Sequence, residues 1–560
     1  MAGESRGWMI LMVTIWIQAC TGTNFDFSSY SSELKAAMGI SQVQLNYLAV
    51  ASDLGKAFGW SSGLALLYFP MPAVLFLAAG FGFLGYGLQW SLITGRISMT
   101  YAPVFVLCLL AGLSICWFNT ICFVLCIRNF TTDRSLALSL TVSFNGISAS
   151  LYSLAANSIN GSPSSYLILN AVLPFLTALF ALNLILRQPP PQSPHASSDR
   201  QIFLVLHTVA FLTGVYLLLL NPASPNPFTS RLILAGAAIL LALPLVVVAR
   251  EWASLSIFSW LEGSNDYDLQ KELIVVEVVD EDDESTTSPR DIDGSNGWLC
   301  CFNEVMTKDR ITKLGEEHGA RRLIRRLDFW LYYISYFCGG TVGLVYSNNL
   351  GQIAQSLGRQ SETTFLVNVY SSCSFFGRLI SAAPDFLAGK ISFARTGWLA
   401  AALVPMPLVF YIMAKTEDGQ ALVAGTALIG LSSGFIFAAA VSVTSELFGP
   451  SSFAVNHNIV ITNIPLGSLL YGLLAALVYD ANGSVGMKRI CEAFATLLRD
   501  GMVVCMGPRC YGKTFLAWGC TSVLGLTCSV ALYLRTRGAY RCAAENGGRR
   551  FVRTCFGGIW

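Results

Sequence analysis

Two charged residues lie inside an apolar stretch of this sequence, where ionisable side chains are rare. Asp53 and Lys56 stand near the middle of the segment Leu45–Phe69, and because they are three residues apart they share one face of a helix and can pair. A third charge, Arg378, lies inside a second apolar segment, Phe365–Pro384. Ionisable side chains at membrane depth are costly and usually face a bundle interior, where they serve function. The three charges therefore predict a polar path through a bundle of membrane helices.

Three interpretations of these charges are open from the sequence. In the first, Lys56 or Arg378 attracts an anionic group of a substrate, and a guanidinium suits bidentate recognition of a carboxylate or phosphate. In the second, Asp53 takes up and releases a proton during transport. In the third, the pair is structural and holds two helix bundles together.

Composition places most of the chain in a membrane. It has 560 residues, of which 54% are hydrophobic and 12% charged, and its mean hydropathy is +0.57. A soluble domain carries about 25% charged residues, so this chain is expected to meet a lipid bilayer over most of its length. The formal net charge of +2 and the lack of a basic face give no support to nucleic-acid binding.

Apolar windows of about 20 residues, long enough to cross a bilayer core, recur about fourteen times in a pattern of six, two and six. We expect the first to be a retained helix and not a cleaved signal, because further spans follow it with no soluble domain between. The first six windows are 8–26, 44–68, 72–94, 101–127, 134–156 and 165–187; the middle two are 202–220 and 231–249; the last six are 328–350, 364–384, 396–414, 420–443, 457–479 and 514–535.

The two sets of six windows show a weak internal repeat. The second window of each set carries a glycine followed by a cation, Gly55-Lys56 in one and Gly377-Arg378 in the other. Parallel repeats of six helices are typical of two-bundle transporters. The expected domains are an N-terminal bundle (1–190), two extra membrane helices (191–250), a polar linker (251–327), a C-terminal bundle (328–540) and a tail (541–560).

Charge in the short loops predicts the orientation. The basic residues place both termini, the linker and the tail in the cytosol. The glycosylation sequons at Asn160 and Asn482 then fall on the opposite face, in agreement. The linker is acidic and rich in Ser, Thr and Pro, a composition that cannot bury enough apolar surface to fold. We expect a solvated tether, with a regulatory loop as the alternative.

The cysteines predict one disulfide and no metal site. Most lie in apolar windows, where they act as small hydrophobes. The loop 480–512 holds Cys491, Cys505 and Cys510, and in an oxidising compartment a Cys505–Cys510 bridge is plausible, although a third cysteine leaves the pairing open. No spacing fits a zinc site, and neither a metal nor another cofactor is expected.

One motif imitates a nucleotide-binding loop. Gly80–Gly85 matches G-x-G-x-x-G, but that fingerprint needs a strand before it and a helix after it, whereas this copy lies within an apolar window. Small residues at close spacing let membrane helices approach each other, so the motif predicts helix packing. Since no P-loop and no hydrolase motif occurs either, the chain is not expected to be an enzyme or an ATP-driven pump.

Longer runs of sequence resemble a known family. The first half contains F-D-F-S-S-Y-S-S-E-L-K (25–35), S-Q-V-Q-L-N-Y-L-A-V-A-S-D-L-G-K-A-F-G-W (41–60), C-W-F-N-T (116–120) and R-N-F-T-T-D-R-S-L-A-L-S (128–139). The second half contains G-L-V-Y-S-N-N-L-G-Q-I-A-Q-S-L-G (343–358), Y-S-S-C-S-F-F-G-R-L (370–379) and N-H-N-I-V-I-T-N-I-P-L-G-S (456–468). Together these runs resemble the nuclear-fusion-defective-type nodulin-like proteins, a plant branch of the major facilitator superfamily.

This resemblance implies a two-bundle facilitator that works by alternating access. It supplies no substrate, but the second helix is also similar to that of monocarboxylate and oxalate carriers, which favours an organic anion. The charged loop signature of the superfamily is not recognisable at Gly63–Pro70. The second half keeps Asp385 near the equivalent place, so the resemblance does not carry the usual cytosolic charge latch to the first half.

The sequence therefore predicts an all-α, polytopic membrane protein with two six-helix bundles and about two additional helices between them. We expect a secondary active or facilitative transporter of a small solute, with protons as candidate co-substrates; the alternative is a non-transporting receptor or scaffold of the same fold. The host membrane, plasma membrane or an endomembrane such as the vacuole or ER, is not specified. Asp53 is the candidate coupling or pairing residue, and the candidate substrate residues are Lys56, Arg378, Asn119, Asn145 and Asn348.

Overall fold

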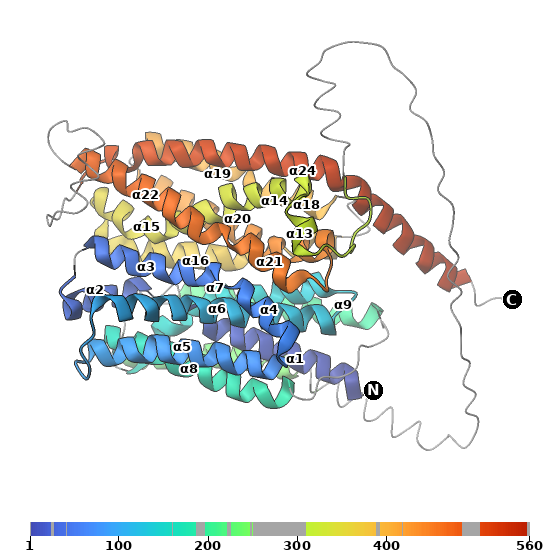
Figure 1. The fold of residues 1–560 in the computed structure, drawn as a ribbon, viewed down its shortest axis with the longest axis horizontal. Coiled ribbons are helices and arrows are strands. Elements are labelled where there is room, and N and C mark those ends of the chain that lie inside the picture. The colour runs from blue at the N-terminus through green and yellow to red at the C-terminus, as the bar shows by residue number, and fades with distance from the viewer. Residues whose placement is uncertain are drawn as a thin grey trace, which may run out of the picture.

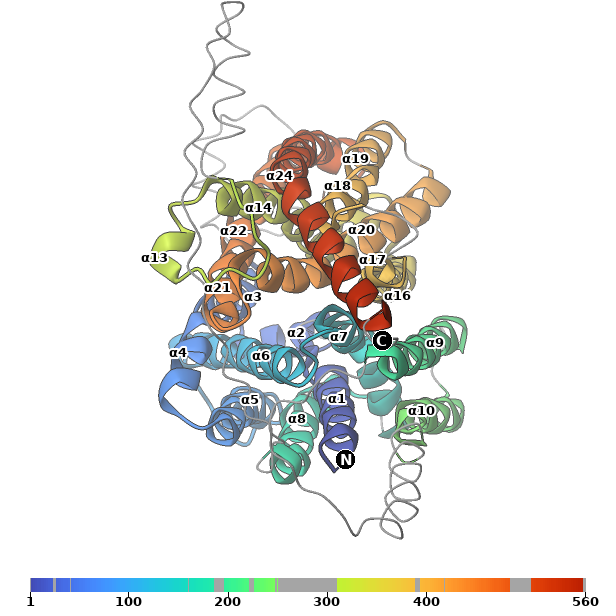
Figure 2. The ribbon, with the colours of Figure 1, turned by 90° about the vertical axis from the view of Figure 1, so that its right-hand side faces the viewer.

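A computed structural model describes most of the chain. The described residues are 2–23, 27–40, 42–159, 161–185, 196–220, 226–246, 249, 310–387, 393–416, 418–483 and 505–556. Every regular element within these ranges is a helix, and most of the helices run along the long axis of the molecule (Figure 1). Viewed along that axis, they form two groups (Figure 2).

The first group contains the helices before the linker. Ten helices follow one another here: α1 (Ala2–Thr21), α2 (Phe27–Met38), α3 (Gln42–Ala57), α4 (Trp60–Tyr68), α5 (Met71–Ile93), α6 (Tyr101–Asn129), α7 (Arg134–Ile159), α8 (Pro163–Ile185), α9 (Ala196–Leu220) and α10 (Pro227–Ala242).

The second group follows the linker and includes one π-helical and one 3₁₀ turn. Its elements are α13 (Ala320–Leu323), α14 (Leu327–Tyr336), the π-turn η2 (Phe337–Thr341), α15 (Val342–Ser356), η3 (Gln360–Glu362), α16 (Thr363–Ile380), α17 (Ala383–Phe386), α18 (Arg395–Leu403), α19 (Pro405–Lys415), α20 (Gly419–Phe448), α21 (Phe453–Ile461), α22 (Asn463–Gly483) and α24 (Arg509–Phe556).

Each of the fourteen predicted windows overlaps one helix or one interrupted helix. The interruptions have local causes. Helix α19 begins at Pro405, which cannot donate a backbone hydrogen bond and clashes with the preceding turn. Between α3 and α4 the chain makes a turn at Phe58 and Gly59. By length and composition, nine helices or helix pairs among the described residues are apolar enough to cross a bilayer: α5, α6, α8, α9, α10, α18–α19, α20, α21–α22 and α24.

We name the two ends of the molecule by what lies there. The terminal end holds the start of α1, α4, α13 and the end of α24, and the far end holds α2 and the start of α24 (Figure 1). Because successive helices reverse direction, α3 begins at the far end and α4 finishes at the terminal end (Figure 1). This naming makes no assumption about which end faces the cytosol.

Three elements were not predicted. Residues 27–38 lie between two predicted windows but form the amphipathic helix α2, which buries Tyr30 and Leu34 (3% and 0% exposed). The last part of the predicted linker is folded onto the second group, because Ile311 and Leu323 are buried in its core (2% and 0% exposed). The predicted tail continues helix α24 to Phe556. The acidic part of the linker lies outside the described residues.

The motif at Gly80–Gly85 is part of helix α5, as expected. Two of its glycines lie against α6: a Cβ atom on Gly82 would meet Ser114 Oγ at 2.7 Å, and one on Gly85 would meet the Leu107 carbonyl oxygen at 2.9 Å. These close approaches need small residues. The motif is therefore a helix-packing device.

The two extra helices are attached to the first group and also reach the second. The indole of Trp16 on α1 donates to the Leu241 carbonyl beyond the middle of α10 at 2.9 Å, and Arg231 on α10 donates to the Ser158 carbonyl on α7 at 2.9 Å. Helix α9 packs on both α7 and α16. Its Arg200 donates to the carbonyl of Asp385 at 2.6 Å, so this pair bridges the two groups.

Candidate functional site

A cavity lies between the two groups of helices. It encloses about 880 Å³, counted with the part open to solvent, and is lined by α1, α3, α6 and α7 from the first group and by α14–α16 and α20–α22 from the second. Concave sites with mostly apolar walls and a few polar groups are where small molecules usually bind. Its charged and amide side chains are Gln18, Lys56, Asn119, Asn145, Arg378 and Asn458, and its aromatic ones are Phe123, Tyr336, Tyr370, Phe437 and His457.

Several helices beside the cavity carry a polar residue within an apolar segment. Gln18 on α1, Lys56 on α3, Asn145 on α7 and Arg378 on α16 line the cavity wall. A helix that faces a polar cavity need not be apolar all round. The cavity therefore accommodates these polar residues.

Asp53 and Lys56 form a buried ion pair at the edge of this cavity. The Lys56 ammonium donates to Asp53 Oδ1 at 2.6 Å, and both residues are 7% exposed. The second carboxylate oxygen of Asp53 accepts a hydrogen bond of 2.8 Å from Ser468 on α22, in the opposite group. Both oxygens of Asp53 thus have partners, one of which joins the two groups. The sequence had predicted the pair but not Ser468.

Arg378 lies in the wall of the same cavity without a carboxylate beside it. Its side chain is buried (5% exposed), and Nη1 donates to the Val142 carbonyl and to Asn145 Oδ1, both at 3.2 Å. Its Nε has no hydrogen-bond partner among the described residues, and the guanidinium stands 5.6 Å from the ring of Phe437. No described residue forms a salt bridge with it, so its positive charge is not neutralised in this structure.

Neutral polar side chains also line the cavity wall, and one hydrogen bond among them joins the two groups of helices. Gln18 on α1 donates to Asn119 on α6 at 2.9 Å. Asn458 on α21 donates to Thr120 on α6 at 3.0 Å, which joins the groups again. The Nδ2 of Asn145 has no partner in the described part of the chain. Asn145 thus brings a buried, unpartnered donor to the residues that line the cavity.

Two irregular segments shape the second side of the cavity. The π-turn Phe337–Thr341 separates Tyr336 from Leu344, both of which line the cavity. The neighbouring interruption between α21 and α22 is tied to it, because Thr341 donates to Asn463 Oδ1 at 2.9 Å. π-turns occur frequently at functional sites, and interrupted helices are common around transporter binding sites.

Most, though not all, of the predicted residues meet at this cavity. Lys56, Arg378, Asn119 and Asn145 line it. Asn348 lies on the exposed side of α15, about one helical turn beyond the cavity-lining Leu344, and is not part of the wall. Sequence reasoning did not single out His457, which is 5% exposed and stacks on Phe453 with ring centroids 5.1 Å apart. A histidine between two asparagines in a polar stretch of a membrane window was the available signal.

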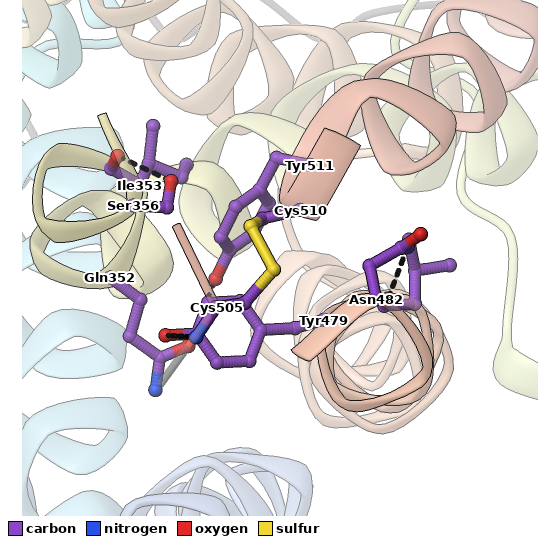
Figure 3. The surroundings of a disulfide bond; sticks show 9 residues. Gln352, Ile353, Ser356, Tyr479, Asn482, Cys505, Cys510 and Tyr511 are labelled. Atoms are coloured by element: carbon purple, nitrogen blue, oxygen red, sulfur yellow. Dashed lines mark hydrogen bonds between the residues drawn. A yellow bond between two sulfur atoms is a disulfide. The ribbon is translucent and has the colours of Figure 1, made fainter. Parts of the chain in front are cut away.

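The remaining predicted positions concern the far end. Cys505 and Cys510 form a disulfide there (Figure 3), and the loop is attached to its neighbours because the Cys505 N–H donates to Tyr479 Oη at 3.1 Å. Asn482 is exposed at the end of α22 (Figure 3). The sequon residue Asn160 and Cys491 lie outside the described residues.

Comparison with known proteins decides the family. Two family descriptions match, "Nodulin-like" over residues 7–249 and "NFD4, C-terminal domain" over residues 312–542. Protein NUCLEAR FUSION DEFECTIVE 4 of Arabidopsis thaliana is 53% identical over 551 residues, which cover 96% of this chain and 90% of the relative. This chain belongs to the nodulin-like family. A more distant relative of this nodulin-like chain is the "Probable transporter MCH1" of Yarrowia lipolytica, 25% identical over 199 residues, or 34% of this chain and 38% of that one.

The nodulin-like chain has the fold of the major facilitator superfamily. A structure of the proton:xylose symporter XylE bound to 6-bromo-6-deoxy-D-glucose aligns with a TM-score of 0.52 and 12% identity, covering 94% of this chain and 95% of that one. An inward-facing, unoccupied bacterial homologue of the human lysosomal transporter Spinster aligns with a TM-score of 0.52 and 11% identity, covering 96% and 98%. The likeness at this identity concerns the fold, and with the apolar helices it identifies an integral, multi-pass membrane protein.

Proposed function

We propose that this protein transports a small organic anion across a membrane by alternating access, with the cavity between its two helix groups as the binding site. One observation carries the proposal: Arg378 is a buried cation in the cavity wall with no carboxylate partner among the described residues. A buried charge without a partner is costly, and an arriving carboxylate or phosphate would supply the missing charge and accept from the guanidinium.

The other groups of the wall have supporting roles in this proposal. Asn145 holds Nη1 of Arg378 and has a spare Nδ2 donor for the anion. Asn119 and Lys56 line the same space, although Lys56 is already paired with Asp53. Because Asp53 has partners on both oxygens, it acts here as a pairing residue in preference to a proton carrier. Asn348, which is outside the wall, is left out of the site.

The relatives add support of a general kind. The fungal relative is named as a probable transporter, and the proteins of like fold include a proton:xylose symporter. Neither relative specifies an anion, so the charge of the solute follows from Arg378 alone. Coupling to protons, as in the symporter, is a part of the proposal that a pH step tests.

We propose further that the terminal end faces the cytosol. Exposed arginines gather there, on and beside α13 and at the end of α24, as cytosolic loops usually require. The far end, in contrast, carries the disulfide and the exposed sequon residue Asn482, both of which suit an oxidising, non-cytosolic compartment. The exposed arginines are Arg321, Arg322, Arg325, Arg537 and Arg541.

Transport by the purified full chain in liposomes tests the function. Uptake of labelled carboxylates, with and without an acidic step outside, should be saturable and should fall at least about tenfold in Arg378→Gln, since a charged hydrogen bond contributes about 1.5–3 kcal/mol. The matched control is Arg359→Gln, because Arg359 pairs with Glu362 on the surface and lies outside the cavity. Uptake of no solute by the wild-type chain would instead favour the receptor or scaffold alternative.

A further inference from the structure

The formal charge of the cavity depends on Asp53, which neutralises one of two cations in the wall. Within the described part of the chain, Lys56 and Arg378 are the charged side chains of the wall. Asp53, one turn before Lys56, neutralises that lysine across 2.6 Å. The sum over Asp53, Lys56 and Arg378 is one positive charge, and its unneutralised centre is the guanidinium.

We infer that Asp53 is a selectivity residue that restricts the transported solute to singly charged carboxylates with an apolar body. The inference rests on the proposed function and narrows its substrate class. Asp53 contributes by occupying Lys56, so that one cation and not two is available to a solute. Without Asp53, the same wall would present two cations and would suit a dianion.

The geometry of Arg378 fits one carboxylate. Its Nη1 is used by Val142 and Asn145, while Nε is unpartnered in the described structure. The edge formed by Nε and Nη2 is one that binds a carboxylate through two parallel hydrogen bonds. A second carboxylate on the same solute would find Lys56 already bonded to Asp53, and it would lose its hydration without gaining a cation.

The rest of the wall fits an apolar body. Besides its polar groups, the cavity is bounded by aliphatic and aromatic side chains from both groups of helices, among them Ile115, Phe123, Phe437, Val441 and Ile461. Phe437 stands beside the guanidinium itself. An anion with a hydrocarbon or ring portion would bury that portion here, which an inorganic anion could not do.

The position of Asp53 is what makes it a selectivity residue and not only a structural one. Its second oxygen is held by Ser468 from the opposite group, so the carboxylate is fixed behind Lys56 and cannot turn away from that residue without losing the bond. Both charges of the pair are buried to the same degree, 7% exposed. Exchange of Asp53 for Asn therefore changes the charge of the cavity by one unit with almost no change of shape.

A series of variants that changes the charge stepwise tests the inference. The formal charge is zero in Lys56→Gln, one in the wild type, one in the double variant Asp53→Asn/Lys56→Gln, and two in Asp53→Asn. The double variant is the matched control, because it carries the Asp53 substitution and restores the charge. Ser468→Ala removes the bond across the groups and keeps the charge, so it is expected to keep the wild-type preference.

The measurement is binding to the purified full chain by titration calorimetry at pH 7.5, where all probe carboxyls are ionised. The probes are 4-methylbenzoate against benzene-1,4-dicarboxylate, and hexanoate against hexanedioate, with 4-methylbenzamide as the neutral analogue. The wild type and the double variant should bind the monoanions at least about tenfold more tightly than the dianions. Asp53→Asn should move that ratio about tenfold or more toward the dianions, as one added buried charge would, and Lys56→Gln should weaken both classes.

The outcomes separate this inference from the proposed function. An unchanged ratio in Asp53→Asn, or a wild type that prefers dianions, overturns the inference and leaves anion transport standing. A double variant that behaves like Asp53→Asn also overturns it, because shape and not charge would then be responsible. Absence of binding and uptake for every anion contradicts the proposed function itself. If Asp53→Asn does not yield a monodisperse protein, Lys56→Gln and the double variant decide the question by affinity: binding that is weakened in Lys56→Gln and restored in the double variant supports the inference, and equal binding in these two variants overturns it.

Discussion

Two buried arginines show how the same residue type serves different purposes in this molecule. Arg535 on α24 is 0% exposed and pairs with the equally buried Asp328 on α14 at 2.5 Å. Arg378 is 5% exposed, and among the described residues it donates only to the Val142 carbonyl and the Asn145 amide oxygen. The first charge is compensated within the protein, whereas the second has no counter-charge among the described residues and is the proposed site for an anionic solute. Buried charges that are unpaired reduce stability, and such residues persist where function requires them.

This contrast predicts opposite effects of the same substitution. Arg378→Met should raise the midpoint of thermal unfolding, because it removes an uncompensated buried charge, and it should abolish anion binding. Arg535→Met should lower the midpoint, since the loss of one partner strands Asp328 and costs about 3–5 kcal/mol. Thermal unfolding of the detergent-purified chain, with and without a bound carboxylate, measures both. A destabilising Arg378→Met would show that the guanidinium is part of the structural framework instead.

At the scale of residues, the sequence predicted the charges and missed their neutral partners. Asp53, Lys56 and Arg378 were identifiable because charge in an apolar window is exceptional. Ser468, Asn458 and Thr120 were not, since Ser, Thr and Asn are common in membrane helices, where most bond to a neighbouring helix. Asn348 was predicted on the same argument as Asn145. Their difference depends on the rotation of each helix about its axis, which polarity alone does not determine.

At the scale of elements, the end of the linker caps α21, one of the helices that line the cavity. The Glu317 carboxylate accepts from the backbone N–H groups of Ser451 and Ser452 at 2.7 and 2.9 Å, immediately before α21. The His318 carbonyl accepts from Asn456 at 2.8 Å. A carboxylate at a helix start satisfies free N–H groups and favours the helix dipole. Glu317 therefore fixes the start of the helix that carries His457 and Asn458.

Removal of this cap should loosen α21. Partial burial would raise the pKa of Glu317, but the hydrogen bonds from Ser451 and Ser452 outweigh it and lower the pKa. The capping contribution is therefore fully present above the unfolded-state value near 4.5 and is lost as the pH falls through the lower folded-state value. Glu317→Gln should cost about 1 kcal/mol at neutral pH and remove that acidic dependence.

Hydrogen exchange of the α21 amides at pH 7, followed by thermal unfolding between pH 3 and 6, measures this effect. The matched control is Glu316→Gln: Glu316 is the neighbouring carboxylate, and it pairs with Arg322 at a partly exposed site. Equal exchange in the Glu316 and Glu317 variants would contradict the capping role. The cap could not be predicted from the sequence, because Glu317 lies in a stretch that its composition assigns to a tether and is far from Ser451 along the chain.

At the scale of the whole molecule, hydrogen bonds join the two groups at several levels. Asp53, which lies toward the far end from Lys56, accepts a hydrogen bond from Ser468. Asn458 donates to Thr120. Nearer the terminal end, Ser135 donates to Asp385 at 2.7 Å. In the proposed alternating access, some of these contacts would have to break in turn. The two six-helix sets were predictable from apolar windows and a weak repeat. The register of these contacts was not, because each depends on how two complete bundles face each other.

The interface at the terminal end includes a close approach of two helix backbones. A Cβ atom on Gly63 of α4 would meet the backbone carbon and oxygen of Ala454 on α21 at 2.9 Å. Backbone atoms cannot move aside as a side chain can, so a larger residue must push the two helices apart. Because α4 and α21 belong to different groups, the strain would be relieved by opening the terminal end. Gly63 is thus the position where a small change in one residue should alter the conformation of the whole molecule.

Gly63→Val should therefore favour conformers that are open at the terminal end, retain anion binding and slow transport at least about tenfold, since a bias of 1.4 kcal/mol changes a population ratio tenfold. Spin labels at the exposed positions Tyr68 and Arg325, in a background without other reactive cysteines, should report longer distances. The control is Gly80→Val, because a Cβ on Gly80 would meet nothing within 4 Å; it should keep both distance and rate. Wild-type distances in Gly63→Val would show that the groups do not separate at this contact during transport, and the alternating motion would then have to open elsewhere along the interface.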